Sequence, residues 1–578
     1  MTAEERFVIL ASSLGTIFEW YDFYIYGALG VFLAKYFFSD VAPAAGFIFA
    51  LLTFAAGFAV RPFGALLFGR TGDLVGRKYT FLVTMTLMGL STFLIGVLPS
   101  YATAGIAAPI TLIVLRLVQG LALGGEYGGA AIYVAEHAPP GKRGYYTSWI
   151  QTTATLGLLI GLLIVLGIRT WMGEEAFGDW GWRLPFLFSI ILLAVSIWIR
   201  LRLQESPVFQ RMKELGEGSQ APLAEAFGRW HNAKIAILAL FGATAGEAVI
   251  WYGGQFYALL FLTETLRVPA TTSQILVAIA LAIGTPFFIL FGWLSDKIGR
   301  QPIMLLGFFL AVVTYFPLFQ GITHFANPSL EAALAEAPVV VIADPSECHF
   351  QFNPVGTARF TSSCDIAKAA LVDRSVNYRN EAAPPLTPAS IRVGKQTIAP
   401  TSPDFAKVLG NVLTAHGYPA EADRLQINRV MTVVLLTILV IYVAMVYGPI
   451  AAVLVELFPT RIRYTGLSLP YHIGNGLVRG FPARHRIRHR GRDRGYLRGS
   501  LVSNRRGGDE FRRQFDLSAR NQRPRHHLFV AVVAEPIERS FRGFQIFVIG
   551  LLTEPKIEDG DAPDNVDGRG SEPVVGRN

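Results

Sequence analysis

Apolar runs long enough to cross a membrane recur along the chain, separated by short polar segments. A run of about twenty apolar residues spans ~30 Å of hydrocarbon as an α-helix, and few charges interrupt these runs. A soluble protein would instead alternate apolar with polar faces. The pattern predicts membrane-spanning helices at 7–32, 47–68, 80–98, 106–135, 148–168, 184–203, 235–262, 273–294, 303–320 and 430–454.

Composition and loop charge support a multi-pass membrane protein. Hydrophobic residues make up 52% of the 578 positions and charged residues only 16%. The basic loop residues fall on one side of the predicted bundle, which the positive-inside rule makes cytoplasmic. They are Arg70, Arg77, Lys78, Lys142, Arg143, Arg211, Lys213, Lys297, Arg300, Arg461 and Arg463. We therefore expect a cytoplasmic N-terminus.

The order of the runs predicts two helical halves around a central site. Residues 1–203 form a six-helix bundle, 204–234 a cytoplasmic linker, and 235–476 a second, incomplete bundle. An insertion at 327–426 interrupts the second bundle on the outer side. A polar, arginine-rich tail occupies 477–578.

One pattern occurs in both halves: Gly69-Arg-Thr-Gly-Asp-Leu-Val-Gly-Arg-Lys and Gly292-Trp-Leu-Ser-Asp-Lys-Ile-Gly-Arg-Gln. Its glycines permit a tight turn, and Asp73 or Asp296 can pair with a helix end or a basic partner, holding the inward side closed. The alternative is a solvated loop with positive-inside charges. The predicted gating residues are Gly69, Asp73, Gly76, Arg77, Lys78, Asp296, Gly299 and Arg300.

Several segments carry a family resemblance: Gly15-Thr-Ile-Phe-Glu-Trp-Tyr-Asp-Phe-Tyr-Ile-Tyr-Gly, Arg61-Pro-Phe-Gly, Arg116-Leu-Val-Gln-Gly, Gly124-Gly-Glu-Tyr-Gly-Gly and Glu205-Ser-Pro-Val-Phe. With the repeat, they resemble the metabolite:proton symporter family of the major facilitator superfamily over about 7–325 and 428–476. The resemblance implies an all-α fold of twelve helices in the plasma (inner) membrane. It also implies substrates such as dicarboxylates, tricarboxylates, proline, betaines or shikimate-like acids, without saying which.

Acidic residues inside the predicted spans suggest proton coupling. Glu19 and Asp22 share a helix face with Tyr26, where two carboxylates are costly unless protonated, paired or facing a polar cavity. An approaching Arg61 or Arg116 would favour the ionised form, so that helix movement could load and release a proton. The alternative is a static ion pair that fixes helix packing. The predicted proton-coupling residues are Glu19, Asp22 and Glu126.

Polar and aromatic positions suggest substrate contacts. Arg116 and Gln119 share a helix face, and a guanidinium suits a carboxylate through paired hydrogen bonds, although a gating role for Arg116 is equally open. The aromatic residues of the seventh helix could instead pack between helices. The predicted substrate-binding residues are Arg61, Arg116, Gln119, Tyr26, Glu247, Trp251, Tyr252 and Gln255.

The insertion holds both cysteines of the chain, Cys348 and Cys364. A pair in an oxidising, extracytoplasmic compartment predicts a disulfide, whereas two cysteines alone are weak evidence for a metal site. With short β-like runs such as 339–343, the segment should be a small ordered module or a loop outside the lipid.

The tail departs from the family pattern. After Gly476 the family has two more apolar helices, yet residues 477–578 are polar. The segment 479–498 contains too many arginines to lie in hydrocarbon as an ordinary membrane span. Reading the codons one nucleotide onward permits Gly-Trp-Phe-Gly-Gly and Gly-Leu-Trp-Tyr-Pro, which resemble the missing helices. We interpret the tail as a disordered product of a frameshift, with no evolved affinity for nucleic acid.

These observations predict a monomeric secondary transporter that moves a small carboxylate or zwitterion with protons across the lipid bilayer. No metal, other cofactor or nucleic-acid partner is expected. A membrane enzyme is disfavoured because the sequence lacks a clustered His or Cys ligand set, a Walker loop and a nucleophile elbow. The remaining alternatives are a sensor or receptor that uses the insertion, and an inactive truncated transporter.

Overall fold

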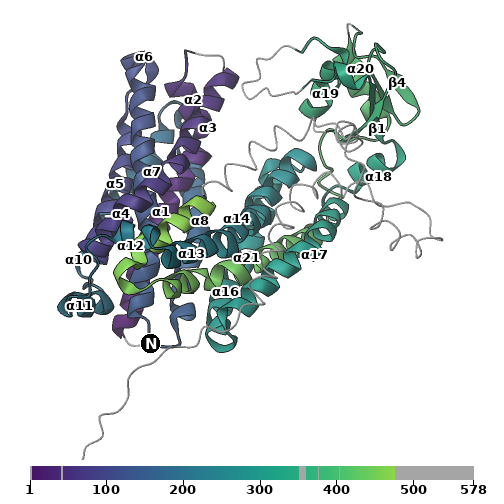
Figure 1. The fold of residues 1–578 in the computed structure, drawn as a ribbon. Coiled ribbons are helices and arrows are strands. Elements are labelled where there is room, and N and C mark those ends of the chain that lie inside the picture. The colour runs from purple at the N-terminus through teal and green to yellow at the C-terminus, as the bar shows by residue number, and fades with distance from the viewer. Residues whose placement is uncertain (1–2, 41–42, 350–359, 375, 403, 476–578) are drawn as a thin grey trace, which may run out of the picture. The chain divides into compact units, whose positions relative to one another are not determined.

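A computed structural model describes residues 3–40, 43–349, 360–374, 376–402 and 404–475 (Figure 1). Among these, nine helices are long and apolar enough to cross a membrane, which confirms the predicted all-α polytopic class. The tail at 477–578 lies outside the described residues. The helices that precede the linker are α1 (Ala3–Ala28), α2 (Gly30–Phe37), α3 (Pro43–Ala59), α4 (Arg61–Leu74), α5 (Arg77–Val97), α6 (Tyr101–Ala104), α7 (Ala107–His137), α8 (Arg143–Met172), α9 (Glu174–Asp179), η1 (Gly181–Arg183) and α10 (Leu184–Leu201).

Two predicted spans are divided in the structure. The span expected at 7–32 ends as α1 at Ala28 and continues as α2. The span expected at 47–68 is interrupted at Val60, after which α4 begins with Arg61 and Pro62. Proline has no N–H and is tolerated in the first turn of a helix, so it favours a new helix start here.

The seventh span runs from Trp230 to Thr265 and changes helix type along its length. Its α-helical pieces are α13 (Trp230–Leu238), α14 (Ala245–Trp251) and α15 (Ala258–Leu260), and its π-helical pieces are η2 (Ala239–Thr244), η3 (Tyr252–Tyr257) and η4 (Phe261–Thr265). Such wide turns are uncommon and frequently occur at functional sites. The periodicity of the sequence predicted the span but not the π turns.

The other helices of the second half match their predicted positions closely. They are α16 (Ala270–Ile298), α17 (Arg300–Ala326) and α21 (Arg429–Leu457), followed by η6 (Thr460–Ile462) and a helical stretch at 463–475. Two short helices lie in the linker, α11 (Pro207–Glu214) and α12 (Pro222–Gly228).

Helix α7 packs closely against α3 and α4 because glycines line the contact. A Cβ atom on Gly120 would lie 2.1 Å from the carbonyl oxygen of Gly57, and one on Gly124 would lie 2.2 Å from that of Arg61. No other residue fits at these distances. The glycines therefore let two backbones touch, as small residues commonly do between membrane helices.

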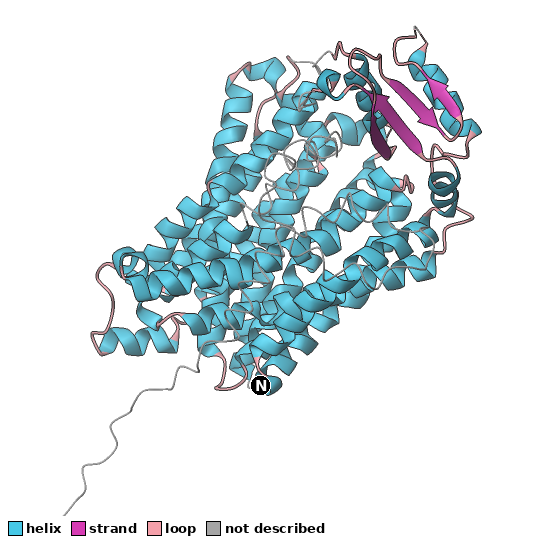
Figure 2. Ribbon diagram, turned by 45° about the vertical axis from the view of Figure 1, so that its right-hand side comes forward, coloured by secondary structure: helices cyan, strands magenta, loops and turns pink. Residues whose placement is uncertain are grey.

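The insertion folds as a small α/β module, and Figure 2 shows the strands gathered in this part of the chain. Its sheet has the order β2-β1-β3-β4, in which β1 and β2 are parallel and the other pairs antiparallel. The predicted strand at 339–343 is β1, and the predicted Cys348–Cys364 disulfide is confirmed. The module consists of α18 (Pro328–Glu336), β1 (Val339–Ala343), η5 (Pro345–Glu347), α19 (Ser363–Asp373), β2 (Tyr378–Ala382), β3 (Ser390–Val393), β4 (Gln396–Ile398) and α20 (Phe405–Ala415).

The module is hydrogen-bonded to the loop that follows the seventh span. The guanidinium of Arg267 donates to the carbonyl oxygens of Arg374 and Pro419, and the Arg267 carbonyl accepts from the N–H of Ala422. Asn327 donates to the Leu266 carbonyl at 2.8 Å. Arg267 has a φ of 56°, which is uncommon for a residue with a side chain. The loop is therefore held by specific bonds rather than by apolar packing alone.

Candidate functional site

The three predicted proton-coupling acids line one cavity inside the first half, residues 1–203. Glu19 and Asp22 reach it from α1, and Glu126 reaches it from α7. All three are buried. The rest of the lining comes from α1, α5 and α10: Phe18, Met85, Met88, Gly89, Leu192, Leu193 and Ser196. Acids that are separated in sequence thus share one largely apolar compartment, which we call the inner cavity.

Asp22 is linked to Arg116 through polar side chains. Ser189 donates a hydrogen bond of 2.6 Å to Asp22, and the Thr92 hydroxyl, which donates to the Met88 carbonyl at 3.0 Å, also interacts with Asp22. Gln119 donates to Thr92 at 2.7 Å and accepts from Arg116 at 2.8 Å. Two neutral polar side chains, Thr92 and Gln119, therefore lie between the Asp22 carboxyl group and the buried guanidinium of Arg116.

Arg116 lies among aromatic rings rather than in open space. Its guanidinium carbon is 4.4 Å from the ring centre of Tyr26 and 4.6 Å from that of Phe54. The structure thus brings together Arg116, Gln119 and Tyr26, three of the predicted substrate-binding residues. Such ring contacts stabilise a cation within the membrane.

A second cavity, which we call the central cavity, lies between the two halves. Arg61 belongs to it, with its guanidinium 4.1 Å from the ring centre of Phe58. The lining residues are Glu19, Trp20, Phe23, Arg61, Leu123, Tyr127, Tyr471, His472 and Asn475. Glu19 therefore borders both cavities.

Aromatic contacts close the halves together around the central cavity. Tyr127 stacks on Tyr471 with ring centres 3.8 Å apart and planes within 6°. The ring centres of Trp20 and Trp251 are 6.0 Å apart. Parallel stacking at van der Waals distance leaves no room for a substrate between the two tyrosines, so they form a wall of the cavity.

The four predicted residues of the seventh span are not part of the central cavity lining. Glu247 accepts a hydrogen bond of 3.0 Å from Asn475, and Trp251 contacts Trp20. Tyr252 packs on the Trp251 ring, and Gln255 is buried in a π-helical turn. Glu247 and Trp251 therefore contact residues that do line the cavity, and Tyr252 packs behind them on Trp251.

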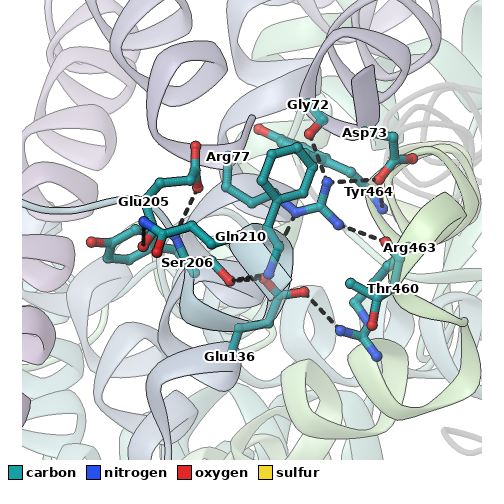
Figure 3. A network of polar contacts seen from close by, with 12 residues as sticks. Gly72, Asp73, Arg77, Glu136, Glu205, Ser206, Gln210, Thr460, Arg463 and Tyr464 are labelled. Carbon is teal, nitrogen blue, oxygen red and sulfur yellow. Dashed lines mark hydrogen bonds and ion pairs between the residues drawn. The ribbon is translucent and has the colours of Figure 1, made fainter. Parts of the chain in front are cut away.

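The first copy of the repeat ties the two halves together at one end of the bundle (Figure 3). Asp73 accepts hydrogen bonds from the backbone N–H groups of Tyr464 (3.1 Å) and Thr465 (2.8 Å). These groups belong to the first turn of helix 463–475, where N–H groups have no partner within the helix. Arg77 pairs with Asp73 at 3.1 Å and donates to the Thr460 carbonyl at 2.6 Å.

Glu136 extends this network, although no motif in the sequence points to it. It pairs with Arg463 of the second half at 2.7 Å and accepts a hydrogen bond from Ser206, the N-cap of α11 (Figure 3). Glu205 accepts from the backbone N–H of Lys78 at 3.1 Å. The Glu205-Ser206-Pro207 segment of the linker is therefore hydrogen-bonded to Lys78 of the repeat and to Glu136.

The second copy makes the corresponding contact from the other half. Asp296 accepts from the N–H groups of Gly144 (2.8 Å) and Tyr145 (2.7 Å), in the first turn of α8. Arg300 pairs with Asp296 at 2.7 Å and with Glu456 at 2.8 Å.

Backbone geometry or a close contact explains why three of the predicted gating positions are glycine. Gly76 and Gly299 have φ values of 143° and 96°, where a side chain is strained. A Cβ atom on Gly69 would lie 3.0 Å from the Cα of Thr465. Each of these glycines therefore shapes the turn or lets the other half approach.

Arg200 on α10 is a further buried charge that the sequence analysis missed. Its charge inside the predicted span 184–203 was the signal that could have found it, because an ionisable residue within a span is rarely without a function.

Sequence comparison identifies relatives among transporters. A family model described as "Sugar (and other) transporter" matches residues 7–239. The proline/betaine transporter of Salmonella typhimurium (strain LT2) is 37% identical over 325 residues, covering 54% of this chain and 64% of the relative. This chain thus covers less than two thirds of that relative's length. The shikimate transporter of Escherichia coli (strain K12) is 36% identical, with 55% and 72% covered, and the alpha-ketoglutarate permease of the same strain is 33% identical, with 59% and 78% covered.

Structure comparison supports the fold. The proton:xylose symporter XylE of the major facilitator superfamily, bound to 6-bromo-6-deoxy-D-glucose, matches with a TM-score of 0.51 and 16% sequence identity. The match covers 83% of this chain and 87% of that one. At this identity the likeness concerns the arrangement of helices and not the substrate.

Proposed function

Since this chain belongs to the major facilitator superfamily, we propose that it is a proton-coupled secondary transporter of a small organic carboxylate or zwitterion. The observation that carries the proposal is the position of Glu19, which borders both the central cavity and the inner cavity that holds Asp22 and Glu126. Substrate and proton would then meet at one side chain.

The charges around the central cavity fit such a substrate. Arg61 supplies a guanidinium for a carboxylate, and Glu19 supplies a carboxylate for a proton or an amine. The position of Arg116 would respond to the charge of Asp22 through Gln119 and Thr92. The seventh span would complete recognition indirectly, by orienting Trp20 and Asn475 through Trp251 and Glu247.

Alternating access would proceed by movement of residues 1–203 against residues 235–476. In this proposal the end tied by Asp73 and Asp296 faces the cytoplasm, as the basic loops favour, and the N-terminus lies there too. The described structure then has its cytoplasmic end closed. The bonds of Asp73 and Asp296 to the opposite half would break when the substrate is released inward. The membrane would be the plasma membrane, and one chain would suffice because both cavities form within it.

The test uses the purified full chain in proteoliposomes with an inward proton gradient. The first substrates to assay are those in the names of the relatives: proline, betaine, shikimate and alpha-ketoglutarate. We expect at least one of them to accumulate against its gradient, and its addition to drive measurable proton entry. Binding without movement would instead favour a receptor. If correctly inserted protein neither binds nor moves any of them, the result contradicts the proposal and favours the inactive truncated transporter.

A further inference from the structure

Arg200 carries a positive charge in the interior of the first half without an ordinary hydrogen-bonding partner. Its side chain is 1% exposed, and its three guanidinium nitrogens donate no hydrogen bond within the described part of the chain. A buried guanidinium is costly unless nearby charges or rings stabilise it. Its stabilisation must therefore come from what surrounds it.

Two features hold the guanidinium in place. Its carbon lies 3.1 Å from the ring centre of Phe81 on α5, which gives a cation–π contact. The guanidinium also lies against Gly15 of α1, where an added Cβ atom would stand 1.9 Å from one of its nitrogens. Only glycine leaves this space, and Gly15 stands one helical turn before Glu19.

Two carboxyl groups, those of Glu126 and Glu19, interact electrostatically with Arg200. Neither oxygen of Glu126 has a hydrogen-bond partner among the described residues, and the same holds for Oε2 of Glu19. Both acids line the inner cavity. One cation therefore interacts electrostatically with two carboxyl groups and is hydrogen-bonded to neither of them.

Other titratable groups also face this site. Asp22, on the same helix, and Arg61 of α4 both interact electrostatically with Glu19, and Arg61 lines the central cavity with it. Tyr133 of α7 and Tyr464 of helix 463–475 interact electrostatically with Arg200. Asp22 already has its own donor in Ser189, so it competes less for Arg200 than the two glutamates do.

We propose that Arg200 is a positioning residue for the proton, the internal counter-ion that pairs with whichever of Glu19 and Glu126 is ionised. This rests on the proposed function. A proton that enters from the central cavity binds the Glu19 carboxylate, leaves it, and bonds to an oxygen of the Glu126 carboxylate. Glu19 is then ionised again and Glu126 neutral, and the guanidinium of Arg200, which lies against Gly15, shifts towards Glu19. The total charge of the three groups is the same before and after this transfer.

The test compares two variants with two matched controls in proteoliposomes. Arg200→Met removes the charge and keeps a long apolar side chain, whereas Gly15→Ala keeps every charge but fills the space beside the guanidinium. The controls are Arg202→Met, at an exposed arginine two residues further on, and Gly27→Ala, on the same helix with open space around it. Each variant is assayed for substrate counterflow, which needs no net proton movement, and for uphill uptake across a range of pH.

We expect both variants to retain counterflow and to lose at least about 90% of uphill accumulation. Because loss of a neighbouring cation favours protonated acids, the alkaline limb of the Arg200→Met uptake profile should move to higher pH by about one unit. Arg200→Lys should restore part of the accumulation. Both controls should match the wild type.

An Arg200→Met or Gly15→Ala profile that superimposes on the wild type after scaling for rate would overturn this inference alone. Such a result would show that Arg200 only supports packing. Wild-type protein that moves substrate without protons would instead overturn the proposed function, and this inference with it. Matched membrane expression and monodisperse elution in detergent establish that each variant is folded.

Discussion

Asp73 and Asp296 make the same contact in opposite directions. Asp73, in the first half, accepts two backbone N–H groups at the start of helix 463–475, and Asp296, in the second half, accepts two at the start of α8. A carboxylate at a helix N-terminus satisfies unpaired donors and interacts favourably with the helix dipole. The repeated sequence thus provides two reciprocal ties between the halves.

Weakening these ties should open that end of the bundle. Asp73→Asn with Asp296→Asn removes both charges, and hydrogen bonds to charged groups are worth ~1.5–3 kcal/mol each. We expect labelling of a cysteine introduced at Ser148, which is buried against Gly292, to accelerate about tenfold or more. Both natural cysteines are in the disulfide, so they give no background. Asp404→Asn in the module is the control, and an unchanged labelling rate in the double variant would refute the gating role.

Substitutions of the two acids of α1 should separate the loss of proton coupling from the loss of substrate binding. Asp22→Asn removes the charge that Ser189 and Thr92 contact, so uphill accumulation should be lost while counterflow persists. Glu19→Gln should abolish accumulation too, and should also raise the substrate KM, because Glu19 borders the central cavity. The exposed Glu264→Gln serves as the control. Uphill uptake that survives both substitutions would exclude these acids as proton carriers.

Much of this organisation could be predicted because it repeats or is periodic in sequence. The apolar runs predicted the spans, the repeat predicted Asp73 and Asp296, and two cysteines in one segment predicted their pairing. The repeat predicts a helix end or a basic partner for each aspartate, but it does not identify which helix supplies the N–H groups, because backbone N–H groups have no sequence signature. The Glu136–Arg463 pair, whose members lie 327 positions apart, could not be predicted either.

The disulfide should be protected and should stabilise the module. A thiol-reactive maleimide applied to intact cells should label neither Cys348 nor Cys364 until a reductant is added. Because the two cysteines are 16 residues apart, chain entropy predicts a loss of about 3 kcal/mol on removing the bond. A Cys348→Ser, Cys364→Ser double variant should therefore be cut within the module at lower protease concentration. Labelling of both positions without reductant would contradict the bond.

Asn327 should contribute more to stability than an ordinary helix cap. It caps α18 through Leu330 and also donates to the Leu266 carbonyl, so Asn327→Ala should cost about 1–3 kcal/mol. Asn428→Ala is the matched control, since Asn428 caps α21 through Met431 but its side chain makes no such bond to the loop. Thermal unfolding in detergent should show a larger fall in Tm for Asn327→Ala. Equal shifts would mean that the bond to Leu266 contributes nothing.

The bonds of Arg267 have a mechanical consequence. Arg267 lies two residues beyond the last π-helical turn of the span that carries Trp251, and its guanidinium is bonded to the module at Arg374 and Pro419. If the end of this span moves by more than a hydrogen-bond length, it must either break both bonds or carry the module with it. A fluorophore on the module would distinguish the two, because in the second case it would travel with a helix buried in the membrane.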